Sequence, residues 1–231
     1  MKKKIGILIT TLLVPAMLMG CTNKLTAIKK VQDTPKTEVK KEPKIDVEKS
    51  AQIMADLIVK DDKEESSKFS FYDKLLSDTS DTEKNVFTTS IKQAFLKEGI
   101  QTNDAQWDNV YNAYRNAVKK VTITAKKITE SDKTASVKIE MTYINFDSVR
   151  DQSATKAKND VVAMHLSDLS VAKQKYVEAY ANNLVTNLNS AEPSTDKKTR
   201  EFDFKVNALS EWVPTNISNY ETGLMEMARG K

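Results

Sequence analysis

Cysteine, histidine and glycine are scarce in this chain of 231 residues, and their scarcity excludes several kinds of site. Cys21, near the N-terminus, is the single cysteine, so we expect no internal disulfide and no cysteine nucleophile in the rest of the chain. His165 is the single histidine, and we expect it on a helix as a partly buried or surface residue. One histidine without further cysteines cannot build a multi-histidine zinc site, so no bound metal is expected.

The few glycines also argue against cofactor binding. Beyond the first 20 residues they are Gly99, Gly223 and Gly230, which form neither a P-loop nor a Rossmann pattern. No serine lies in the G-x-S-x-G motif of a hydrolase nucleophile elbow. Adjacent acidic residues such as Asp61 and Asp62 do not converge on one substrate, and we interpret them as a solvated turn. We expect no cofactor, and a carboxylate site assembled across the fold stays open as an alternative.

The N-terminus has the pattern of an export signal. Three lysines, residues 2–4, precede an apolar stretch over residues 5–18. This stretch is shorter than the roughly 20 apolar residues needed to cross a bilayer, and it contains Pro15. A cleaved signal peptide over residues 1–20 fits this pattern better than a permanent membrane helix does.

Leu18, Met19, Gly20 and Cys21 close this segment, and the stretch resembles the lipobox of bacterial lipoproteins. The resemblance implies that Cys21 receives diacylglycerol and that the peptide is cut before it. Fatty acyl chains such as palmitate would then hold the mature protein at the outer face of the cell membrane. Two chains give stable anchoring, whereas one chain gives only marginal binding. The alternative is an ordinary thiol after a conventional signal peptide.

Residues 21–45 combine this cysteine with a segment that has the composition of a tether. Residues 22–45 include seven lysines, three acidic residues, Pro35 and Pro43, with too few apolar residues to offset the entropy of ordering, so we expect a disordered spacer. Its lysines would either be attracted to anionic lipid headgroups or simply be solvated. Residues 1–20 hold three of the 36 basic residues and no acidic ones, which leaves 33 basic and 32 acidic residues. This balance gives no argument for a nucleic-acid partner.

Residues 46–231 are expected to form a single α+β domain, because their apolar residues recur at helical spacing, then at strand spacing, then at helical spacing again. Three helices precede an antiparallel hairpin, and a helical pair separates this hairpin from a third strand and a final helix. The expected segments are 47–59, 80–98, 103–118, 121–125, 137–143, 153–189, 202–206 and 218–227. Residues with the pattern of helix caps mark the expected starts: Ser80, Asn103 with Gln106, Ser153, Ser167 or Asp168, and Ser218.

The stretch from Arg200 to Leu224, with E-W-V-P at 211–214, resembles the C-terminal end of the DUF5105 family of Gram-positive lipoproteins. The resemblance implies a cystatin-like or NTF2-like fold, in which N-terminal helices pack on a curved antiparallel sheet. The chain departs from that simple fold by carrying a helical pair, at about 153–189, between strands two and three.

Six aromatic residues are the remaining candidates for a site: Trp107, Tyr111, Tyr114, Tyr176, Tyr180 and Trp212. Helical spacing favours core packing for them, and the family resemblance also allows them to line a pocket between helix and sheet. Because the common catalytic and metal-binding motifs are absent from the sequence, we favour a non-catalytic, membrane-anchored module that binds an unknown envelope protein or ligand. The alternative is an envelope enzyme that uses carboxylates or tyrosines without histidine or cysteine.

Overall fold

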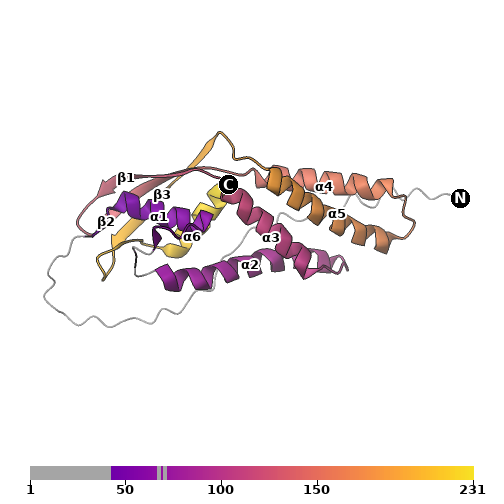
Figure 1. Ribbon diagram of the computed structural model, residues 1–231, viewed down its shortest axis with the longest axis horizontal. Helices are drawn as coiled ribbons and strands as arrows, with labels where there is room; N and C mark the ends of the chain where they lie inside the picture. The colour runs from indigo at the N-terminus through magenta and orange to yellow at the C-terminus, as the bar shows by residue number, and fades with distance from the viewer. Residues whose placement is uncertain (1–42, 67–68, 70–71) are drawn as a thin grey trace.

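The computed structural model describes residues 43–66, residue 69 and residues 72–231. The signal peptide, the lipobox (Leu18, Met19, Gly20 and Cys21) and most of the tether lie outside these residues, so the expectations for them stay predictions. In chain order the described elements are α1 (Val47–Lys60), α2 (Tyr72–Lys97), α3 (Asp104–Val118), β1 (Ile123–Glu130), β2 (Thr134–Thr142), α4 (Phe146–Ala163), α5 (Leu169–Ser190), β3 (Lys197–Val206), β4 (Trp212–Pro214) and α6 (Ile217–Ala228) (Figure 1). The combination of helices with an antiparallel sheet agrees with the α+β class that the sequence predicts.

The four strands form one antiparallel sheet in the order β1-β2-β3-β4. Along β2, Val137, Ile139 and Met141 are fully buried, while the residues between them face the other side and stay partly exposed. This alternation belongs to a sheet with one buried face and one solvated face. The hairpin of β1 and β2 is therefore confirmed. β4 is an additional short strand, since it pairs with β3 where we expected only the end of the third strand.

Helices α1 and α6 pack against the sheet and cover its buried face (Figure 1). The Tyr220 hydroxyl on α6 donates a hydrogen bond to the Ala51 carbonyl on α1 (2.8 Å), and the Tyr220 ring meets Phe202 and Phe204 of β3 edge-on. Gly223 allows α6 to approach β3 closely, because a Cβ at this position would lie 2.9 Å from the Phe202 ring. The missing side chain at Gly223 thus sets the distance between the final helix and the sheet.

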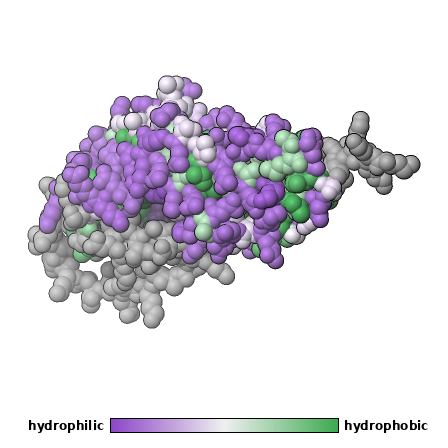
Figure 2. Space-filling view, turned by 45° about the vertical axis from the view of Figure 1, so that its right-hand side comes forward, coloured by the Kyte–Doolittle hydropathy of each residue, from purple (hydrophilic) through white to green (hydrophobic). Residues whose placement is uncertain are grey.

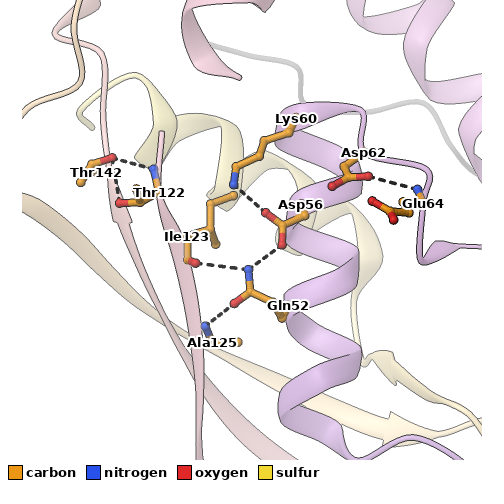
Figure 3. A network of polar contacts seen from close by, with 9 residues as sticks. All are labelled: Gln52, Asp56, Lys60, Asp62, Glu64, Thr122, Ile123, Ala125 and Thr142. Carbon is orange, nitrogen blue, oxygen red and sulfur yellow. Dashed lines mark hydrogen bonds and ion pairs between the residues drawn. The ribbon is translucent and has the colours of Figure 1, made fainter. Parts of the chain in front are cut away.

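Side chains of α1 also bind the outer edge of β1 (Figure 3). Gln52 accepts a hydrogen bond from the Ala125 N–H (2.9 Å) and donates one to the Ile123 carbonyl (3.2 Å). Glu48 accepts a hydrogen bond from the Lys127 N–H (3.0 Å). Because β1 lies at the edge of the sheet, α1 satisfies backbone groups there that no described strand pairs.

The remaining helices form a second region, in which α3 packs against α2 and α5, and α4 packs along α5. Of these helices, α4 and α5 extend away from the sheet, whereas α2 runs beneath α1 and α6 (Figure 1). Phe95 of α2 stacks on Trp107 of α3 with 5.6 Å between ring centroids, and it meets Tyr180 of α5 at 6.2 Å. Phe146 at the start of α4 contacts the Tyr114 ring edge-on at 5.7 Å. Aromatic contacts therefore join these helices, and the buried apolar residues of both regions belong to one cluster.

The visible surface is mostly hydrophilic, with apolar residues near the end of the molecule at which α4 turns into α5 (Figure 2). Val162, Met164, Leu169 and Val171 are exposed around this turn, Met164 to 48%. Among the described helices, none combines the length and the apolar character that crossing a membrane requires.

Helices α2 and α6 begin earlier than the capping patterns predict. α2 begins at Tyr72 and not at Ser80, because neither proline nor glycine interrupts the helix upstream of Ser80. α6 begins after Asn216, whose side chain accepts a hydrogen bond from the backbone N–H three residues on (3.0 Å), and not at Ser218. Asparagine caps a helix as well as serine does, and Asn216 comes first in the chain.

Helix α4 begins at Phe146, after its cap Asn145, and not at Ser153 as expected. Ser153 is buried inside the helix, where its hydroxyl donates to the Val149 carbonyl at 2.7 Å. Because this hydrogen bond satisfies the hydroxyl, the serine does not end the helix. His165 follows α4 in an exposed turn with a left-handed φ of 50°, so it lies in a loop and not on a helix.

Candidate functional site

The six aromatic residues singled out in the sequence are all buried: Trp107, Tyr111, Tyr114, Tyr176, Tyr180 and Trp212. Five of them contact other aromatic rings, as Tyr176 does with Tyr180 in a stacked pair at 6.1 Å. Burial raises the pKa of both of these phenols above the ordinary value of tyrosine. Trp212, in β4, is 2% exposed. These six side chains thus pack in the interior of the protein.

An acidic pair lies among helices α2, α3 and α6. Glu83 on α2 accepts hydrogen bonds from the Tyr111 hydroxyl (3.2 Å) and from Nη1 of Arg115 (3.3 Å), both on α3. Burial, together with the negative charge of Glu83, raises the pKa of Glu221 on α6 to about 7. Burial and the same charge raise the pKa of Tyr111. These side chains are the ones that the carboxylate alternative would use. Within the described residues, no set of three or more histidine, cysteine or acidic side chains is arranged to hold a metal ion.

A groove of about 430 Å³ runs between α3 and α5. Its volume lies in the range of about 300–1,000 Å³ that is typical of small-ligand sites. The lining is made of neutral side chains, most of them amides: Gln106, Asn109, Asn112, Ala113, Asn116, Asn182, Val185, Thr186 and Asn189. None of these nine residues is charged, and none is a histidine or a cysteine. We take this asparagine groove as the candidate functional site.

The spacing of the asparagines explains why they share one groove. On α3, Asn109, Asn112 and Asn116 recur every three or four residues, which places them on one face of the helix. On α5, Asn182 and Asn189 are seven residues apart, or about two turns, and therefore also share a face. The opposite face of each helix carries the buried residues that anchor it in the core, so these amide rows face each other at the surface.

Hydrogen bonds between the two helices fix both ends of the groove. At one end, the Gln106 side chain donates to the Glu178 carbonyl at 3.2 Å. We expected Gln106 to turn back on Asn103 as half of a capping box, and the structure corrects this, because its amide reaches the neighbouring helix instead. Beyond the other end, Nζ of Lys120 donates to the carbonyls of Asn189 (3.1 Å) and Ala191 (2.9 Å). The two helices therefore run parallel, and the width of the groove is held at both ends.

The asparagines of α5 have two different environments. Asn183 donates a hydrogen bond to Asp160 (3.4 Å) and Asn187 donates one to Ser153 (2.9 Å), so both bind side chains of α4. The asparagines of the groove differ, since their side chains have no hydrogen-bond partner among the described residues: Asn109, Asn112, Asn116, Asn182 and Asn189. The amides that face α4 hold the fold together, whereas those that face α3 are available to a ligand.

The groove was not predicted from the sequence, because an exposed asparagine on a helix is also typical of ordinary solvated surface. A signal was nevertheless present, since α3 and α5 together have 37 residues and contain seven asparagines. Asparagine is a poor helix former, so its repetition at helical spacing indicates a demand other than helix formation.

Comparison with solved structures shows similarity to the crystal structure of a candidate lipoprotein, YcdA from Bacillus subtilis, with a TM-score of 0.56 and 17% sequence identity. The similarity covers 79% of this chain and 55% of that chain, so the match spans little more than half of the neighbour's length. No family model matches the chain, and no curated protein matches it. The DUF5105 resemblance therefore stays a prediction. At this level of identity, what the two chains share is a fold.

Proposed function

We propose that this protein is an envelope lipoprotein, anchored at the outer face of the cell membrane, that binds an envelope ligand without changing it chemically. The membrane anchor would be diacylglyceryl-Cys21, exposed by removal of residues 1–20. Two observations support this anchor. One is the lipobox-like sequence from Leu18 to Cys21, and the other is the fold shared with a candidate lipoprotein.

The asparagine groove is the observation that carries the binding role. A side-chain amide offers two hydrogen-bond donors and one acceptor oxygen, and the five asparagines of the groove leave theirs unused among the described residues. A concave site with several convergent polar groups is suited to hold a ligand in one orientation. Binding is favoured over catalysis, because the lining offers no carboxylate, imidazole or thiol to act as an acid, base or nucleophile.

We assign the sheet with α1 and α6 to the cystatin-like or NTF2-like class, and α4 with α5 to an insertion between β2 and β3. This assignment is supported by the chain order and by the packing of α4 on α5 and of α5 on α3. One continuous cluster of buried residues is consistent with a single domain over residues 46–231.

A second candidate function rests on Glu221 and its neighbours. A carboxyl group with a pKa of about 7 can both take up and release a proton near neutral pH, which general acid and base catalysis requires. Glu83 and Tyr111 would complete such a site without histidine or cysteine. We rank this function second, because Glu83 is engaged by Tyr111 and Arg115 within the protein.

The binding role is tested with full-length protein extracted from membranes in mild detergent and mixed with purified envelope material from the producing bacterium. Sedimentation measures the retained fraction. We expect Asn112→Ala/Asn116→Ala to weaken retention at least tenfold, because two amides that contact the ligand are removed. Alanine is the better helix former, so the variant should be at least as stable as the wild type, and a weaker retention cannot be attributed to unfolding.

The matched control is Asn85→Ala, which removes an exposed asparagine from α2, outside the groove lining. This variant should be retained like the wild type. Equal retention of the wild type and the groove variant would refute the binding role. Release of soluble fragments from the envelope material, lost in Glu221→Gln, would favour the enzyme instead.

A further inference from the structure

We infer that the asparagine groove binds a neutral, hydroxyl-rich glycan chain. This inference rests on the proposed function, since it takes the groove as the binding site and names the chemical class of its ligand. The lining residues, their charge and their arrangement on two parallel helices carry the inference.

The charge of the groove excludes strongly ionic ligands. Phosphate and carboxylate groups are bound in proteins mainly by arginine, lysine or helix N-termini. The groove is lined by neither arginine nor lysine. At the N-terminus of α3, the Asn103 side chain already accepts a hydrogen bond from the Ala105 N–H. Lys120 lies beyond one end, and its ammonium group is engaged by the carbonyls of Asn189 and Ala191. A ligand that fits these walls is therefore polar and uncharged.

The amides complement hydroxyl groups in particular. A hydroxyl group donates one hydrogen bond and accepts others, and an asparagine side chain can donate two and accept at its oxygen. Facing rows of amides can thus bind hydroxyls on both edges of a sugar ring. Ala113 and Val185 also line the groove, and their small apolar side chains leave room for the flat, less polar face of such a ring.

The length of the groove favours a chain over a single sugar. Gln106 and Asn116 are ten residues apart on α3, which corresponds to about 15 Å along the helix axis. On α3 the amides repeat at roughly one per helical turn, and on α5 Asn182 and Asn189 are about two turns apart. A chain of similar sugar units can therefore form similar hydrogen bonds with successive amides along the groove.

A peptide fits the groove less well. Proteins bind peptides at open sheet edges, in apolar helix grooves, on aromatic surfaces for proline-rich segments, or at arginine clusters. The groove lies between two helices and has no aromatic lining, and Ala113 and Val185 are its apolar side chains. It therefore has no pocket that would select peptide side chains.

Titration of the full-length, detergent-solubilised protein with single compounds tests the inference. The probes are chitotetraose and maltotetraose as neutral oligosaccharides, tetraalanine as a peptide, and tetrapolyphosphate as a polyanion. We expect saturable binding of at least one oligosaccharide, no binding of the other two compounds, and a loss of at least tenfold in affinity in Asn112→Ala/Asn116→Ala. Asn85→Ala should bind like the wild type.

Failure of this inference can be told from failure of the proposed function. Two results would overturn the glycan assignment and leave the binding role intact. In the first, envelope material retains the protein through the groove but neither oligosaccharide binds. In the second, tetraalanine or tetrapolyphosphate binds in the groove. If the groove variant is retained as well as the wild type, both are overturned. If oligosaccharide binds equally to the wild type and the groove variant, the glycan site lies elsewhere and the inference is refuted.

Discussion

Glu221→Gln should stabilise the protein at alkaline pH and flatten the dependence of its stability on pH. Glu221 is partly buried on α6, and removal from water disfavours its charged form. The negative charge of Glu83 acts in the same direction, so the pKa of Glu221 is raised to about 7. Tyr111 and Arg115 approach Glu83 from α3, and the positive charge of Arg115 offsets part of the negative charge at this place.

The direction of the effect follows from the two pKa values of Glu221. An ordinary glutamate has a pKa of 4.5, which we take for the unfolded chain, and the folded protein holds its proton up to about pH 7. The contribution of Glu221 to the stability of the wild type is therefore fully present below pH 4.5. It is lost as the pH rises from 4.5 to about 7. The difference between the two values corresponds to at most about 3 kcal/mol. Contact of the side chain with water reduces this to about 1–2 kcal/mol.

Urea unfolding at pH 5, 6, 7 and 8 measures this prediction. The wild type should lose about 1–2 kcal/mol between pH 5 and pH 8, and Glu221→Gln should lose much less, because glutamine carries no titrating proton. Glu140→Gln is the control. Its hydrogen bond and ion pair with Lys138 lower the pKa of Glu140, so this group has already titrated below pH 5 and leaves the slope above pH 6 unchanged. An equal slope in Glu221→Gln and the wild type would show that Glu221 does not have a raised pKa.

Four further predictions concern the anchor, the tether and the core. Cys21→Ala should release the protein from cells or leave its precursor unprocessed, and recovery of a processed protein in washed membranes would contradict the lipid anchor. Deleting residues 22–42 should leave the melting temperature of the mature protein unchanged, whereas a clear drop in a thermal scan would show that this segment packs on the domain. Trp212→Ala should lower the free energy of unfolding by about 3–5 kcal/mol, because the side chain is buried, and a loss below about 1 kcal/mol by urea unfolding would oppose this reasoning. Gly223→Ala should cost about 1–3 kcal/mol in the same assay, since the new methyl group meets the Phe202 ring, and wild-type stability would mean that α6 can move aside.

The parts of the fold that depend on short-range pattern were predictable from the sequence. Alternation along β1 and β2 predicted the hairpin, because a strand exposes every second side chain to the same face. The cap at Asn103 was predicted correctly, since its side chain accepts a hydrogen bond from the Ala105 N–H. For α5 the sequence left Ser167 and Asp168 as alternatives, and Asp168 is the cap. The helix starts predicted at Ser80 and Ser153 were wrong, because a capping motif does not show whether the residues before it are helical as well.

The candidate site was beyond the reach of local pattern. Gln106 and Glu178 are 72 residues apart in the chain and meet because α3 and α5 pack side by side. The sequence of one helix does not show which other helix will pack beside its polar face. Likewise, the pKa of Glu221 depends on its burial and on Glu83, which lies on another helix. Three-dimensional packing, and not residue type, gave these groups their properties.

The hydrogen bonds from α1 to the edge of β1 have a consequence for proteins that are crowded on a surface. A lipid anchor would confine many copies to two dimensions, where the local concentration is high and an open strand could pair with the same strand of a neighbour. Gln52 and Glu48 occupy the backbone groups through which such pairing would begin. At the opposite edge, β4 is three residues long and ends at Pro214, which has no N–H to donate. Both margins of the sheet therefore resist self-association, and densely displayed copies can remain separate molecules.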